Sequence, residues 1–84
     1  MQPELSIVMA AWNRAELTRQ CLASLQTCKL ALEIILIDNG SQDNTVAMVR
    51  ENFTHVRILL NKRNEGVTAA WRQGLAAAGE DRPR

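Results

Sequence analysis

The side chains best suited to chemistry stand in short polar stretches, each of which follows an apolar run. Asp38 and Asn39 follow residues 34–37, four apolar residues typical of a strand buried on both faces of a parallel sheet. A carboxylate at the end of such a strand is partly desolvated, and it accepts hydrogen bonds from a base N–H or from ribose hydroxyls. In the alternative interpretation, Asp38 shapes the turn by bonding nearby backbone amides.

Trp12 and Asn13 follow a second apolar run, which predicts a strand over residues 5–10. Asn13 could bind a ligand through its amide, or it could cap the next helix in a capping box with Glu16. Trp12 could stack on a base or fill the mouth of the core. The sequence alone leaves both pairs of alternatives open.

The third polar stretch contains Asn64 and Gly66, between a predicted strand over residues 56–60 and a predicted helix that carries Arg72. The asparagine and glycine could simply begin the helix, and Arg72 could face solvent. However, the carboxyl ends of parallel strands meet at one edge of a sheet, and ligands bind there. The convergence of the three stretches is therefore a stronger indication than any one of them.

Three helices are predicted between and after the strands. The first has an apolar stripe that we expect to face the sheet, formed by Leu17, Cys21, Leu22 and Leu25. The second begins at Asp43, a natural N-cap, and ends near Asn52. The third covers residues 67–78 and ends at Gly79, and the polar tail, residues 80–84, is expected to fray.

This β-α-β-α-β-α order predicts an α/β fold, namely half of a doubly wound, Rossmann-like parallel sheet with strand order 3-2-1. Residues 1–84 then form a single partial domain. In a doubly wound sheet a fourth strand lies beside the first. Without it the first strand is an exposed edge, through which we expect the chain to self-associate.

The composition excludes several classes of protein. A net charge of +1 gives no electrostatic footprint for nucleic acid, and 46% apolar residues argue against disorder. Two cysteines and one histidine lack the spacing of a zinc site, and the cysteines, seven residues apart along a helix, are not placed for a disulfide. No stretch reads as a membrane span or a signal peptide, so we expect a cytoplasmic location.

Two other doubly wound folds fit poorly. A dinucleotide-binding domain needs G-x-G-x-x-G after its first strand, whereas residues 10–15 read Ala-Ala-Trp-Asn-Arg-Ala. A phospho-receiver domain needs an acidic pair at this point, and Asn13 stands where a carboxylate is required.

Four motifs occur in a recognisable order. They are Ser-Ile-Val-Met-Ala-Ala-Trp-Asn-Arg at 6–14, Cys-Leu-Ala-Ser-Leu at 21–25, Glu-Ile-Ile-Leu-Ile-Asp-Asn-Gly-Ser-Gln-Asp-Asn-Thr at 33–45, and Asn-x-x-Asn-x-Gly at 61–66 leading to Gly74-Leu75. Together they resemble the N-terminal, nucleotide-binding part of a family-2 glycosyltransferase of the GT-A fold. The resemblance covers the chain from about residue 5 to residue 78.

The resemblance implies that this chain binds the nucleotide of a nucleotide-diphosphate sugar, most commonly UDP in the family. The residues that match nucleotide-binding positions are Ala11, Trp12, Asn13, Asp38, Asn39, Asn64, Gly66 and Arg72. Four positions depart from the family: Ala11 replaces a threonine, Trp12 replaces a tyrosine, and Trp71-Arg72 stands for a usual Arg-Asn pair.

The resemblance also implies an enzyme that transfers the sugar to an acceptor hydroxyl with inversion. In the family, the Asp-x-Asp motif that holds Mn²⁺ or Mg²⁺ and the general base both follow the region matched here. We therefore expect no catalytic residue, no bound metal and no activity in the 84-residue chain alone. The alternative is a non-catalytic remnant, or a regulatory module that binds a nucleotide or a partner.

Overall fold

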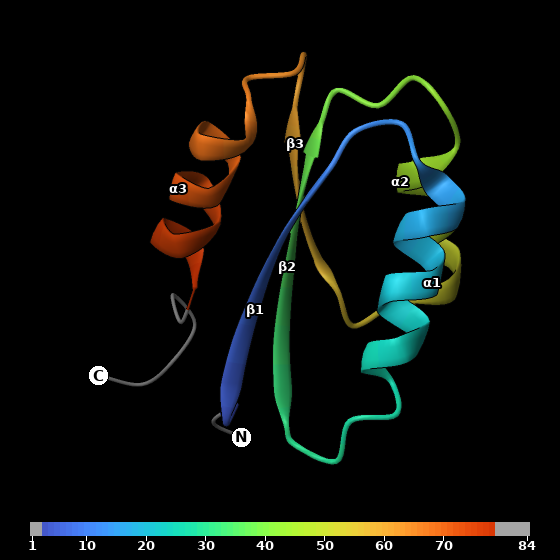
Figure 1. Cartoon of the computed structure of the whole chain (residues 1–84), viewed down its shortest axis with the longest axis vertical. Helices are drawn as coiled ribbons and strands as arrows, with labels where there is room; N and C mark the ends of the chain where they lie inside the picture. Colours follow the sequence, from blue (N-terminus) through green and yellow to red (C-terminus); the bar gives the residue numbers. More distant parts are fainter. Residues whose placement is uncertain (1–2, 79–84) are drawn as a thin grey trace.

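The structure, a computed structural model, describes residues 3–78 as three strands and three helices that alternate along the chain (Figure 1). In chain order they are β1 (Leu5–Ala11), α1 (Ala15–Leu25), β2 (Leu32–Asn39), α2 (Thr45–Asn52), β3 (Arg57–Asn61) and α3 (Val67–Ala77). The α/β class is confirmed. β1 and β3 begin and end within one residue of the predicted bounds, and β2 extends two residues beyond the predicted apolar run at each end. The predicted helix stop at Gly79 and the tail lie outside the described residues.

The three strands form one parallel sheet, and β2 lies at its centre. β1 pairs with β2 from Leu5 opposite Leu32 to Ala11 opposite Asp38, and β3 pairs with the other side of β2. By adjacency the sheet therefore reads β1-β2-β3. Within the described part of the chain, the outer edges of β1 and β3 carry no further strand.

The sheet is covered by helices on both faces, with α1 and α2 on one side and α3 on the other (Figure 1). Successive side chains of a strand point to opposite faces. Ile34 and Leu36 of β2 consequently pack in the core under α1 and α2, and Ile35 and Ile37 pack in the core under α3. All four are buried, which confirms the prediction of a strand covered on both faces.

Helix α1 is rotated relative to the predicted stripe. Leu22 is buried and Leu25 is half-buried, but Leu17 and Cys21 are exposed, so the prediction was wrong for these two residues. Thr18 is buried in their place, because residues 18, 22 and 25 share one face of a helix with 3.6 residues per turn. Cys21 and Cys28 are both free and exposed, which agrees with the expected absence of a disulfide.

The capping box, one of the two interpretations of Asn13, does not form at the start of α1. Arg14 occupies the N-cap position and makes no side-chain cap bond, while Glu16 pairs with Arg19 one turn later. Asn13 has a φ of 51°, in the left-handed region that asparagine tolerates better than most residues. This conformation turns the chain out of β1, and the side chain of Asn13 bonds to a neighbouring turn instead of to α1.

No helix in residues 3–78 has the length and apolar character needed to cross a membrane.

Candidate functional site

The three polar turns meet at the carboxyl edge of the sheet, which lies at the top of Figure 1. The strand register fixes this arrangement, because Ala11 lies opposite Asp38, and Asn39 lies opposite Asn61. Alternation along β2 then sends Asp38 towards the α1 and α2 face and Asn39 towards the α3 face. Asp38 and Asn39, although adjacent in sequence, therefore lie on opposite faces of the sheet.

Asp38 is a buried carboxylate with one oxygen satisfied and one oxygen unsatisfied. Its Oδ2 accepts a hydrogen bond from the backbone N–H of Ser41 at 2.9 Å. The residue is only 2% exposed, and its Oδ1 is buried and has no hydrogen-bond partner among the described residues. A buried acceptor without a partner is costly, so such an atom in a native structure calls for a specific explanation.

Asn13 joins the turn after β1 to the turn after β2. Its backbone N–H donates to Ser41 Oγ at 2.8 Å, and its side-chain Oδ1 accepts from the N–H of Gln42 at 2.7 Å. The preceding Trp12 is 54% exposed, while Ala11 is buried beside Asp38. The indole of Trp12 is therefore exposed at the sheet edge, between the buried Ala11 and Asn13, which is fixed by hydrogen bonds.

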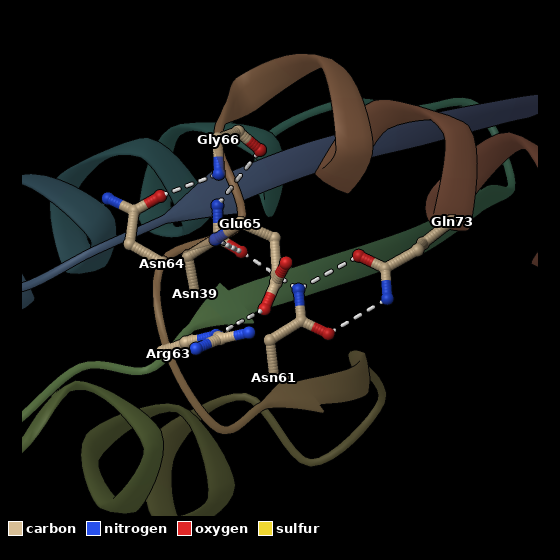
Figure 2. Close-up of polar contacts among 7 residues, drawn as sticks. All are labelled: Asn39, Asn61, Arg63, Asn64, Glu65, Gly66 and Gln73. Carbon is tan, nitrogen blue, oxygen red and sulfur yellow. Dashed lines mark hydrogen bonds and ion pairs between the residues drawn. The ribbon is translucent and has the colours of Figure 1, made fainter.

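Asn39 uses its side chain inside the protein, as Figure 2 shows. Its Oδ1 accepts from Asn61 Nδ2 at 2.8 Å and from the N–H of Glu65 at 3.4 Å, and its Nδ2 donates to the carbonyl of Gly66 at 3.3 Å. Asn61 in turn exchanges two hydrogen bonds of 2.8 Å with Gln73 of α3. Asn39 therefore holds the third turn against the sheet.

Asn64 and Gly66 shape the start of α3. Asn64 Oδ1 accepts from the N–H of Gly66 at 2.8 Å, and Gly66 takes the N-cap position with a φ of 89° (Figure 2). No side chain caps this helix. The first N–H groups of α3 are therefore not satisfied by a cap, and a helix N-terminus of this kind attracts anions.

Arg72 does not join the other predicted residues. The side of α3 that faces the sheet is formed by Ala70, Gly74 and Ala77, all buried. Arg72 is exposed and lies on the opposite side of the helix, since each residue advances the helix by about 100°. The geometry brings together seven of the eight predicted positions and leaves Arg72 outside.

Asp43 joins the first turns of α1 and α2. Its Oδ2 accepts from the N–H of Ala15 at 3.3 Å, and its Oδ1 accepts from the N–H of Thr45 at 3.0 Å and also from the Thr45 hydroxyl. The Thr45 hydroxyl, together with these backbone amides, lowers the pKa of Asp43 below its ordinary value. Asp43 was predicted as a cap of α2 only, and Asn44 takes the formal N-cap position of that helix.

We expect Asp43→Asn to make folding less sensitive to acid. Because the pKa of Asp43 is lower in the folded state, its carboxylate stabilises the fold above the ordinary value of 3.8, and this contribution disappears as the pH falls through the folded-state pKa. Circular dichroism during acid titration should show a steeper loss of structure below about pH 4 in the unmodified chain than in the variant. Glu51→Gln is the control, since Glu51 is exposed at the far end of α2 and takes no part in the hydrogen bonds of Asp43. Identical acid transitions in the unmodified chain and Asp43→Asn would contradict this role.

The sequence did not single out Ser41, Asn61 or Gln73 as partners of site residues. Ser41 bonds both Asp38 and Asn13, and Asn61 bonds Asn39. The strand register would have identified Asn61, because it stands opposite Asn39. Within residues 3–78, no three His, Cys, Asp or Glu side chains cluster closely enough to hold a metal ion.

Comparison with known proteins gives consistent matches. The sequence profile described as Glycosyl transferase family 2 matches residues 6–81. The uncharacterized glycosyltransferase YibD of Escherichia coli (strain K12) is 39% identical over 79 residues, which cover 89% of this chain and 23% of that protein. The glycosyltransferase AglE of Haloferax volcanii is 33% identical over 79 residues, covering 87% of this chain and 26% of AglE.

Among solved structures, the mannosyltransferase PcManGT from Pyrobaculum calidifontis, in complex with GDP-Man and Mn²⁺, superposes with a TM-score of 0.81. The sequence identity is 21%, and the match covers 93% of this chain and 25% of that one. This similarity establishes the GT-A type of fold for the described part. The chain spans about a quarter of the length of each of these relatives.

Proposed function

Because this chain belongs to glycosyl transferase family 2, we propose that its carboxyl sheet edge binds the nucleotide of a nucleotide-diphosphate sugar. One observation carries the proposal, namely the buried Oδ1 of Asp38, which has no partner among the described residues. A ligand N–H donated to this oxygen would remove its energetic cost on binding. The GDP-Man complex of the structural neighbour supports a nucleotide sugar as the ligand class.

The hydrogen bonding of the Asp38 carboxylate also limits which nucleotide base can bind. Ser41 already occupies Oδ2, so Oδ1 offers one acceptor, which suits the single N3–H of uracil or thymine. The Watson–Crick edge of guanine has two adjacent N–H donors and would need both carboxylate oxygens. We therefore propose UDP as the preferred nucleotide, with the exposed Trp12 indole stacking on the base.

The remaining predicted residues take supporting roles in this proposal. Asn13 and Asn39 hold the turns that surround Asp38, and the buried Ala11 lies opposite it on β1. Asn64 and Gly66 present the uncapped start of α3 to ribose or phosphate. Arg72 is exposed on the side of α3 turned away from the sheet, so we assign it a long-range attraction for the diphosphate.

We further propose that the complete enzyme transfers the sugar to an acceptor hydroxyl with inversion, in the cytoplasm, and that the 84-residue chain is inactive alone. The described residues do not fit a divalent cation, because their carboxylates do not cluster. Any Mn²⁺ or Mg²⁺ and the general base would be held by other parts of the longer relatives. In those relatives the sheet would continue beyond β1, as the doubly wound order 3-2-1 requires.

A ¹H–¹⁵N correlation spectrum of the labelled chain, titrated with UDP, dTDP, GDP and CDP, tests the proposal. We expect UDP to shift the amides of Trp12, Asn13 and Ser41 with a Kd of about 0.1–1 mM, because only part of the binding site is present. GDP and CDP should bind more weakly. No response to any nucleotide would refute the proposed function, and a preference for GDP would refute the assignment of the base.

A further inference from the structure

Two hydrogen-bond donors stand next to the Asp38 carboxylate and donate to no residue in the described part of the chain. Ser41 Oγ accepts from the backbone N–H of Asn13 at 2.8 Å, so a lone pair of the hydroxyl faces Asn13 and its hydrogen is left for another acceptor. Asn13 Oδ1 accepts from the N–H of Gln42 at 2.7 Å. This bond fixes the orientation of the Asn13 amide, and its Nδ2 remains as a donor at the other end.

Both donors belong to the hydrogen-bonded chain that holds Asp38. The N–H of Ser41 donates to Asp38 Oδ2 at 2.9 Å, so two consecutive bonds connect the carboxylate through Ser41 to Asn13. Ser41 and Asn13 are half-buried, and Asn13 directly follows the exposed Trp12. A base that stacks on Trp12 and donates an N–H to Asp38 Oδ1 would therefore have Asn13 and Ser41 along its polar edge.

The three groups form a pattern that matches one kind of base. Asp38 Oδ1 is a buried acceptor without a partner among the described residues, and Ser41 and Asn13 each supply a donor. Uracil has the complementary edge, because its N3–H lies between two carbonyl oxygens. Thymine has the same edge, since its methyl group lies elsewhere on the ring.

We propose that Asn13 and Ser41 determine the base specificity of this site, each by donating a hydrogen bond to one of the two carbonyl oxygens that flank N3–H. This inference rests on the proposed nucleotide binding and adds two contacts to the one made by Asp38. Guanine has a carbonyl on one side of N1–H and an amino group on the other, so one donor of the site would face a donor. Cytosine has no hydrogen on N3. A site built to hydrogen-bond a polar edge strongly rejects bases that leave its groups unpaired.

UDP analogues with sulfur in place of one carbonyl oxygen test these contacts, because sulfur is a weak hydrogen-bond acceptor. We expect 2-thio-UDP and 4-thio-UDP each to bind the unmodified chain about 3–10-fold more weakly than UDP, as measured by titration of the ¹H–¹⁵N spectrum. One of the two losses should disappear in Ser41→Ala, and the other in Asn13→Asp. A residue that only maintained the turn would weaken the binding of all three ligands by the same factor.

Asn13→Asp is the more informative variant because it preserves the contact within the protein. Its Oδ1 can still accept from Gln42, and aspartate also tolerates the left-handed backbone of this position. An oxygen replaces the Nδ2 donor, however, so the affinity for UDP should fall at least about 5-fold. Asn44→Asp is the matched control, since it adds the same charge at an exposed position that makes no side-chain cap bond. Equal losses in the two variants would show an effect of charge alone and would overturn the proposal.

The possible results separate this inference from the proposed function. If UDP binds and both thio analogues bind equally well, nucleotide binding stands, but the two carbonyl contacts do not exist. Losses for the analogues that persist unchanged in both variants would assign the contacts to other residues and would also overturn the inference. If no nucleotide binds the unmodified chain, the proposed function and this inference fail together. Circular dichroism establishes that each variant is folded before it is titrated.

Discussion

The Gly40→Ala substitution is expected to lower the free energy of unfolding by about 2–5 kcal/mol, a large share of the stability of a small domain. Two costs combine. Gly40 has a φ of 76°, a conformation that residues with a Cβ rarely adopt. The added Cβ would also lie 2.6 Å from Cα of Arg63, and backbone atoms cannot move aside as a side chain end can. Gly40 therefore lets the turn after β2 touch the turn after β3.

Gly66→Ala is the matched control for this prediction. Gly66 also has a positive φ, of 89°, but a Cβ there would meet no atom within 4 Å. It should cost only the backbone strain, about 1–3 kcal/mol. Urea unfolding of both variants measures the difference, which reports the contact between the two turns. Equal losses in the two variants would show that the turns are not packed as described.

Asp38→Asn is expected to weaken UDP binding about 10–100-fold, which corresponds to one hydrogen bond to a charged group. The same variant should be at least as stable as the unmodified chain without ligand. It removes a buried charge whose Oδ1 has no partner among the described residues, and it keeps an oxygen that can accept from Ser41. Loss of binding without loss of stability is the pattern expected of a ligand-binding group.

Asp43→Asn serves as the control for Asp38→Asn, because it changes another carboxylate at the same sheet edge. Both oxygens of Asp43 are bonded within the protein, so UDP affinity should change less than about twofold at neutral pH. The titration described above and thermal unfolding give the two readouts. Unchanged affinity in Asp38→Asn, or unfolding of that variant without ligand, would place Asp38 among the residues that only maintain the fold.

The sequence predicts the strands and the edge where the three turns meet, because both depend on local patterns. The apolar run at residues 34–37 and the polar residues after it were enough to locate β2 and the edge where the turns meet. The rotation of α1 was missed because Leu17 fits the same apolar spacing as Leu22, and only packing against the sheet selects the buried face.

The detailed roles of the site residues depend on contacts between segments distant in sequence. Asn13 was interpreted as a cap or a ligand-binding amide, yet its side chain bonds Gln42, 29 residues away. At the start of α1, the backbone N–H of Ala15 donates to the carboxylate of Asp43, 28 residues away. Asn39 resembles a nucleotide-binding position, but its amide holds the third turn. Local pattern cannot reveal such partners, because they exist only once the sheet brings the turns together.

The most direct test of the central claim is the carboxyl ¹³C resonance of Asp38, followed while UDP is added. If the N3–H of uracil donates to Oδ1, this resonance should shift on saturation with UDP. It should not shift with the analogue methylated at N3, which has no hydrogen to donate at that position. A carboxyl resonance that UDP leaves unchanged, or that both nucleotides shift equally, would contradict recognition of the base by Asp38.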